Sequence, residues 1–189
     1  RGAPLPGVQP DPRSLELTRS PMFVWFAAGS VAIVWTIFRS PAVDYRVVAL
    51  GSRLALVEVP FGVGPFQTLM LSVVALALTM GLTIGQRLRR RRWLGIPIGM
   101  FLHLVLDASW SDQSVFWWPF GGWGFPDVSA PVVQRGIWSL LLELVGCMVA
   151  LWLWGEFGLD DPERRGRLWR TGQLDRTLMR RRGVPEDDE

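Results

Sequence analysis

The chain alternates long apolar stretches with short charged or Pro-rich ones, and this pattern predicts an all-α protein. Apolar runs at 21–38, 65–86, 94–110 and 131–157 approach or exceed the ~20 residues that a helix needs to cross a bilayer. A fifth helical stretch, 41–59, carries several charges. The sequence therefore predicts an all-α integral membrane protein with about four transmembrane helices and one re-entrant or interfacial helix.

The stretch 41–59 differs from the other four because it carries four charged residues. Their spacing of about seven residues places them on two faces of a helix. Asp44, Gly51 and Glu58 fall on one face, and Arg46 and Arg53 on roughly the opposite one. Such a helix is a poor lipid-exposed span, so we interpret it as re-entrant, interfacial or enclosed by the other helices. A solvated amphipathic connector is the alternative.

The two ends of the chain differ from the transmembrane domain at 21–158. Residues 1–20 are Pro-rich and lack the apolar core of a signal peptide, which predicts a flexible tail. Residues 159–189 are rich in arginine and predict a cytoplasmic tail that lies on anionic lipid headgroups or binds a protein partner. Nucleic acid is the less favoured partner, because arginine runs beside membrane helices are mostly topology signals.

Charge sets the expected orientation in the cell membrane. All 20 basic residues are arginine. With four crossings and both termini in the cytoplasm, the inner side holds three arginines of the N-terminal tail, five of 87–92 and eight of the C-terminal tail, 16 of 20. Making 41–59 a fifth crossing would put Arg13 and Arg19 outside and separate Asp44 from Asp107, so the four-crossing arrangement is favoured.

The single histidine, His103, precedes Asp107 by four residues in an apolar helical run. This spacing places the two Cβ atoms on one helix face, about 5–6 Å apart, so the side chains could share a proton or a metal ion. An Asp in mid-membrane costs ~2.5–3.5 kcal/mol, which predicts that Asp107 lies near the interface or faces polar partners. Gly95 and Gly99 continue the same ridge and predict close packing of a neighbouring helix.

Three further features lie in or beside the last two apolar regions, and two of them have two interpretations. Glu143, alone inside the last crossing, is a hydrogen-bonding strut or an outer member of the site, and we favour the strut. The aromatic segment 108–130 is an interfacial anchor, or it forms a lid or an apolar groove for a lipid-like substrate. Cys147 has no second cysteine to pair with and predicts a buried packing residue.

A family resemblance rests on the sequence HLVLD at 103–107 followed by FWWPF at 116–120. These motifs resemble the C-terminal signature of small bacterial inner-membrane proteins grouped as LexA-binding, metal-dependent hydrolases. Pro41-Ala42-Val43-Asp44 is similar to the family's earlier acidic motif, and Phe66-Gln67-Thr68-Leu69 stands where the family has a histidine-bearing motif. The resemblance covers roughly residues 40–126, and Gln67 replaces the histidine.

The resemblance implies a divalent metal site near the outer leaflet. His103, Asp107 and Asp44 would be the metal ligands, with Glu58 as a fourth ligand or as the base, so that His103, Asp107 and Glu58 form the catalytic set. A hydrolytic metal needs three or four ligands and an open position for water. Zinc, manganese and magnesium are the candidates, and oxygen-rich ligation suits the last two better.

Two functional hypotheses follow. In the first, the protein is a membrane-embedded hydrolase whose metal-bound water attacks an ester or phosphoester, with a lipid-linked substrate suggested by the aromatic segment. In the second, it is a non-enzymatic scaffold or partner-binding protein, and His103, Asp107 and Asp44 form a structural cluster that includes Arg53 as an ion-pair partner. A transporter or channel is less favoured, because the chain has no inverted repeat.

Overall fold

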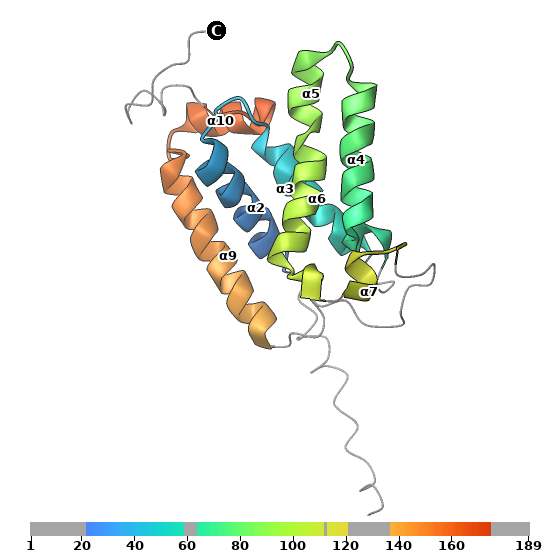
Figure 1. The fold of residues 1–189 in the computed structure, drawn as a ribbon. Helices are drawn as coiled ribbons and strands as arrows, with labels where there is room; N and C mark the ends of the chain where they lie inside the picture. The colour runs from blue at the N-terminus through green and yellow to red at the C-terminus, as the bar shows by residue number, and fades with distance from the viewer. Residues whose placement is uncertain (1–21, 59–63, 112, 121–136, 175–189) are drawn as a thin grey trace, which may run out of the picture.

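The structure is a computed structural model that describes residues 22–58, 64–111, 113–120 and 137–174. Every regular element in these ranges is a helix, and none is a strand (Figure 1). The longer helices are α2 (Phe23–Phe38), α3 (Tyr45–Leu54), α4 (Leu69–Leu82), α6 (Gly95–Leu106), α9 (Ile137–Glu156) and α10 (Pro162–Thr171). The shorter ones are η1 (Ala55–Val57), η3 (Pro65–Gln67), α5 (Arg87–Trp93), η4 (Ser109–Ser111) and α7 (Gln113–Phe116). The all-α prediction is thus confirmed for the described residues.

In the described part of the chain, one helix is long and apolar enough to cross a membrane. Trp138–Glu156 of α9 is long and apolar enough to cross a bilayer, whereas α2 and α4 are apolar but shorter. Together α3 and η1 cover residues 45–57, about 20 Å along a helix axis, which is less than a ~30 Å hydrocarbon core. The predicted number of four crossings is therefore not established by helix length.

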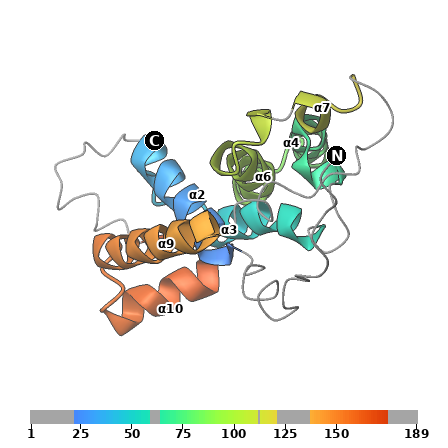
Figure 2. The ribbon, with the colours of Figure 1, turned by 90° about the horizontal axis from the view of Figure 1, so that it is seen from below.

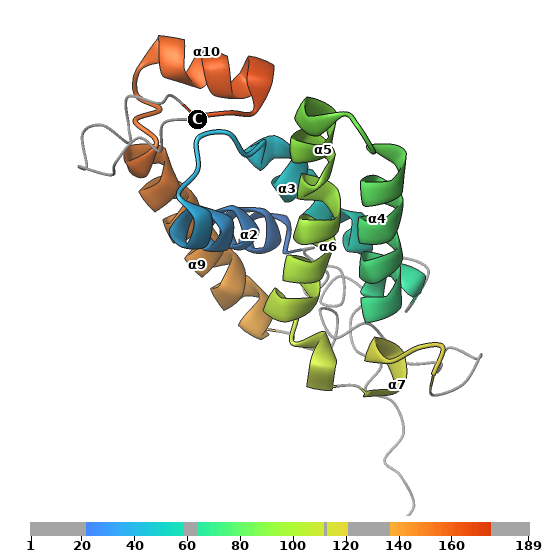
Figure 3. The same cartoon turned by 45° about the horizontal axis from the view of Figure 1, so that its top comes forward.

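The main helices pack in the order α9, α2, α3, α6 and α4, each against the next, and α3 lies between α2 and α6 (Figure 2). Helix α10 lies across the end where α2 and α9 finish (Figure 3). Helices α2, α4 and α9 run toward the α5 and α10 end of the bundle, which we call the α10 end (Figure 1). Helices α3 and α6 run away from it, toward the end that carries α7, which we call the α7 end.

The contacts between α2 and α9 show that these two helices run parallel. Near their starts, the Glu143 carboxylate accepts hydrogen bonds from the backbone N–H of Val24 and Trp25, at 3.0 and 3.1 Å. Near their ends, Trp35 Nε1 donates to Glu156 Oε1 at 3.0 Å. The four-crossing arrangement requires the first and last crossings to be antiparallel, so the observed direction differs from that prediction.

Glycines bring α3 and α6 into backbone contact. A Cβ added to Gly99 would overlap the Val48 carbonyl oxygen and lie 2.7 Å from the Ser52 nitrogen. A Cβ on Gly95 would lie 3.1 Å from the Val47 side chain. The prediction that this glycine ridge packs closely against a neighbouring helix is confirmed.

A cluster of aromatic rings closes the core at the α10 end. Trp35, Tyr45 and Phe157, from α2, α3 and the residue after α9, lie with ring centroids 5.2–6.2 Å apart. All three are buried. Cys147, which we expected to be buried, is exposed on α9, where most of the large apolar side chains are exposed as well.

Candidate functional site

Asp44 lies at the α10 end and acts as the N-cap of α3. Its Oδ1 accepts a hydrogen bond from the Val47 N–H at 3.3 Å, which satisfies one of the free donors of the first helical turn. Arg46 Nε lies 3.5 Å from Oδ1, and Arg92 Nε of α5 lies 3.3 Å from Oδ2. The carboxylate is 2 % exposed, so its charge is balanced by two arginines and a helix terminus.

The C-terminal end of α10 completes this junction. Gly172, with φ of +74°, ends α10 in the left-handed conformation that glycine adopts without strain. Its carbonyl accepts a hydrogen bond from the Tyr45 N–H at 3.0 Å, and a Cβ on Gly172 would overlap the Asp44 carboxylate. The predicted ligand Asp44 thus joins α3, α5 and α10.

His103 and Asp107 lie toward the other end of α6. Both side chains are 2 % exposed, and Asp107 is the C-cap of the helix. The Ser109 hydroxyl donates to Asp107 Oδ2 at 3.2 Å, and the His103 ring packs on Phe26 of α2 with ring centroids 4.1 Å apart. The pair is therefore buried, with a serine hydroxyl bonded to Asp107 and an aromatic ring packed on His103.

The three predicted metal ligands are not brought together. Arg92, which contacts Asp44, precedes Asp107 by 15 residues of the nearly continuous α5–α6 helix, or roughly 22 Å. Among the residues that the structure describes, no group of three His, Cys, Asp or Glu side chains could hold a metal ion. A zinc ion on His103 and Asp107 would need at least one further protein ligand, and a metal held by this pair stays a prediction.

Glu58 and Gln67 lie at the α7 end, beside the start of α4. Glu58 Oε2 accepts a hydrogen bond from the Phe66 N–H at 2.9 Å, so the predicted base caps the η3 turn. Burial raises the pKa of the Glu58 carboxyl, and the hydrogen bond from Phe66 opposes that rise. Gln67 is buried, and its Oε1 has no hydrogen-bond partner among the residues that the structure describes.

Helix α4 packs against α6, and the one buried residue of α4 is the polar Ser72. The short connection between α4 and α5 makes a helical hairpin, so Gln67, at the start of α4, and Asp107, at the end of α6, lie at the same end of the bundle (Figure 1). This end therefore collects the buried polar groups that a hydrolytic site would use.

The hydrogen bonds of Glu143 confirm its interpretation as a strut between two helices. Its two carboxylate oxygens accept from the first turn of α2, whose N-cap residue Met22 provides no side-chain cap. One turn further along α9, a Cβ on Gly146 would lie 2.5 Å from the Trp25 Cα, so the two helices approach closely beside the carboxylate. The acid of the last apolar run thus stabilises the neighbouring helix α2.

The aromatic segment is described in part. Trp117 and Phe120, which follow α7, are 51 % and 78 % exposed, an arrangement typical of side chains at a membrane interface. Residues 121–136, which hold the rest of the predicted anchor or lid, lie outside the described residues. Both interpretations of the segment stay predictions.

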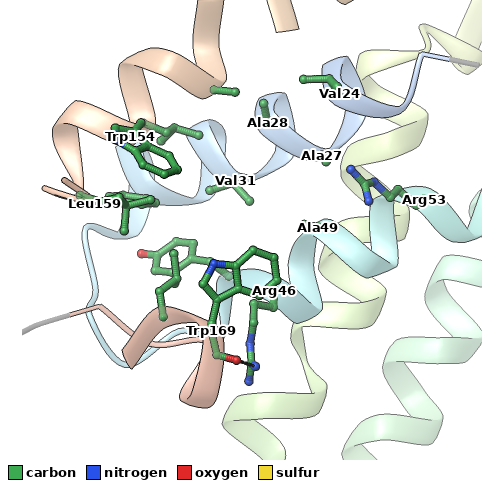
Figure 4. Close-up of a pocket in the computed structure, with 15 residues that line it drawn as sticks. Val24, Ala27, Ala28, Val31, Arg46, Ala49, Arg53, Trp154, Leu159 and Trp169 are labelled. Atoms are coloured by element: carbon green, nitrogen blue, oxygen red, sulfur yellow. Dashed lines mark hydrogen bonds between the residues drawn. The ribbon is translucent and has the colours of Figure 1, made fainter. Parts of the chain in front are cut away.

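The sequence pattern did not predict an apolar groove between α2, α3, α9 and α10 (Figure 4). Arg46 and Arg53 of α3 both line it, so Arg53 is not the partner of Asp107 that one hypothesis required. One feature of the sequence points to this groove, the pair of arginines seven residues apart on one face of 41–59. The sequence does not show which helices pack opposite that face.

Comparisons with protein-family models, with curated proteins and with solved structures found no match for this chain. The resemblance of HLVLD and FWWPF to metal-dependent hydrolases therefore has no independent test.

Proposed function

We propose that this protein is a multi-pass membrane protein with a scaffolding or partner-binding role, in which the acidic side chains are structural. The observation that carries the proposal is the use of three carboxylates as helix caps: Asp44 for α3, Glu58 for η3 and Glu143 for α2. A carboxylate committed to backbone N–H groups and arginines is a poor metal ligand or base, because binding a metal would break those bonds.

The distribution of arginine supports an orientation with the α10 end in the cytoplasm. Eleven of the 12 described arginines lie there: Arg39 and Arg46, five in α5 and four in α10. Arg53 is the exception. Because the described chain starts at the α7 end and finishes at the α10 end, we propose an odd number of crossings. In this arrangement α3 and η1, although shorter than the hydrocarbon core, pass between α2 and α6 in place of a re-entrant segment.

Hydrolysis at the α7 end is the second candidate. It is favoured by one observation, the burial of His103 and Asp107 one helical turn apart with Ser109 bonded to the carboxylate. A metal held there would polarise a bound water or a substrate carbonyl, and its ligands would be His103 and Asp107 with groups still to be identified.

Metal content separates the two candidates. The full-length protein is purified in detergent, loaded in turn with zinc, manganese and magnesium, and analysed by elemental mass spectrometry beside His103→Ala and Asp107→Ala. The scaffold proposal expects no metal above the background of both variants. About one metal per chain, lost in both variants while their melting temperatures in detergent stay close to that of the wild type, would overturn it in favour of hydrolysis.

Orientation is tested by labelling of single cysteines in intact cells. In a Cys147→Ser background, a cysteine at exposed Gln113 is expected to react with a membrane-impermeant maleimide, and a cysteine at exposed Thr171 is expected to react only after the cells are opened. Equal labelling of both positions from outside, or the reverse pattern, would contradict the proposed topology.

A further inference from the structure

The groove between α2, α3, α9 and α10 has an apolar lining and a volume of about 290 Å³. Small side chains form its floor, among them Ala27 and Ala28 of α2 and Ala49 of α3, while Trp154 and Trp169 stand at its sides (Figure 4). This volume is at the lower limit of small-molecule sites, and it suits one flexible chain better than a ring system.

Two charged side chains of α3 interrupt the apolar lining of the groove. Arg46 and Arg53 are the charged residues of the lining, all of which the structure describes, and no acidic residue accompanies them. They are seven residues apart, about 10 Å along the helix. The groove therefore combines an apolar floor with a net positive charge.

The two arginines differ in what they contact. Arg46 lies 3.5 Å from the Asp44 carboxylate and donates to the Trp169 carbonyl, so its charge is already balanced. Arg53 makes no hydrogen bond or ion pair with any residue that the structure describes, and its side chain is exposed at the end of the groove nearest Val24. A guanidinium at membrane depth requires an anion, because a lone charge there is costly.

We propose that this groove binds one acyl chain of an anionic phospholipid whose phosphate accepts hydrogen bonds from Arg53. The planar guanidinium matches phosphate oxygens in a bidentate geometry, and the apolar floor runs from Arg53 toward α10 over the length of a partly inserted chain. The proposal rests on the membrane insertion proposed above. Because the Arg53 end lies near the start of α2, the lipid would come from the outer leaflet.

The test is native mass spectrometry of the full-length, delipidated protein titrated with phosphatidylglycerol. We expect wild-type protein to bind phosphatidylglycerol at least tenfold more tightly than phosphatidylcholine with the same acyl chains. Arg53→Gln should lower the phosphatidylglycerol affinity about tenfold or more, the loss expected for a charge-assisted hydrogen bond. The matched control is Arg165→Gln, which removes an exposed arginine of α10 that does not line the groove and should leave the affinity unchanged.

A second variant keeps the charge and fills the groove. Ala49→Leu should weaken phosphatidylglycerol binding while Arg53 is still present, and a melting temperature close to that of the wild type shows that each variant is folded. If Ala49→Leu fails to fold, the pair Arg53→Lys and Arg53→Gln decides, because lysine should retain part of the affinity as a point charge and glutamine should not.

Three results would overturn the proposal. They are equal phosphatidylglycerol affinity in Arg53→Gln and wild type, equal binding of the two headgroups by wild type, and Arg53-dependent binding of oleate without binding of phosphatidylglycerol. Membrane insertion is tested separately, by retention of the protein in membranes washed with alkaline carbonate. Release by carbonate would refute the membrane proposal, whereas retention with unchanged lipid binding in Arg53→Gln would refute the lipid proposal alone.

Discussion

At the α10 end of the bundle, Asp44 contacts two arginines and the first turn of α3, whereas toward the α7 end Asp107 contacts a serine hydroxyl and lies one turn from a histidine packed on Phe26. Both carboxyl groups are 2 % exposed. The first lies between two arginines, and the second accepts a hydrogen bond from the Ser109 hydroxyl. The comparison teaches that equal burial does not give two acids equal roles, since the partners decide what each one can do.

The region between the two acids is closed by backbone contact. Gly99 of α6 lies against the backbone of Val48 and Gly51 of α3, and Gly95 lies against Val47 and the Val48 nitrogen, so the two helices approach closely. The α10 end therefore has a rigid base on which charge pairs can be held at fixed distances. The α7 end depends on side-chain packing, such as that of Phe26 on His103.

The largest expected effect comes from Gly99→Ala, which tests this rigid base. The added methyl group overlaps the Val48 carbonyl and the Ser52 nitrogen, and backbone atoms cannot rotate away as a side chain can. We expect the free energy of unfolding in mixed detergent micelles to fall by about 3 kcal/mol. The matched control is Gly81→Ala in α4, where a Cβ meets no atom within 4 Å and helix propensity should raise stability by about 0.5–1 kcal/mol. Equal effects of the two changes would refute close contact of α3 with α6.

Asp44→Ala should have the next largest effect, because it removes the cap of α3 and the partner of Arg92 together. The expected loss is about 2–3 kcal/mol, and it is limited because Arg46 and Arg92 are partly exposed and can be hydrated. Asp44→Asn keeps an oxygen for the Val47 N–H and should lose about 1 kcal/mol. Thermal unfolding in detergent measures both. Loss of a bound metal from Asp44→Asn at unchanged stability would instead return Asp44 to the ligand set.

The features that could be predicted from the sequence are those that depend on a single helix. The closeness of α6 to a neighbour follows from Gly95 and Gly99, whose spacing exposes the backbone on one face, and the structural role of Glu143 follows from its isolation in an apolar run. Helix existence was predictable for the same reason, since hydrophobic length and periodicity are local properties.

Pairing and direction were not predictable, because they depend on which helices meet. The charges of 41–59 argued against an inserted helix, yet Asp44 is neutralised by Arg92 from another helix, and Arg46 reaches the backbone of α10. Arg13 and Arg19 weighed against a fifth crossing, although they are few beside the arginines of α5 and α10. A non-spanning 41–59 requires α2 and α9 to be antiparallel, whereas the structure shows them parallel and places Asp44 at the opposite end of the bundle from Asp107.

The smallest expected effect concerns Glu58, which lies between η1 and η3, outside the helices proposed to cross the membrane. Its pKa is raised in the folded state by burial, so the folded protein binds a proton more tightly there than the unfolded chain. The stability that this protonation contributes is fully present below the ordinary glutamate pKa of 4.5, and it is lost as the pH rises through the folded pKa.

Glu58→Gln removes this titration but keeps an oxygen that can accept the hydrogen bond from the Phe66 N–H. We expect the variant to show a flatter dependence of melting temperature on pH above 4.5 and a stability at neutral pH equal to or slightly above that of the wild type. Glu163→Gln, at an exposed position in the first turn of α10, is the control for a change of surface charge. A strong loss of stability in Glu58→Gln at neutral pH would mean that the charged carboxylate is needed at the α7 end. That result would make the two ends of the bundle alike in their use of charge.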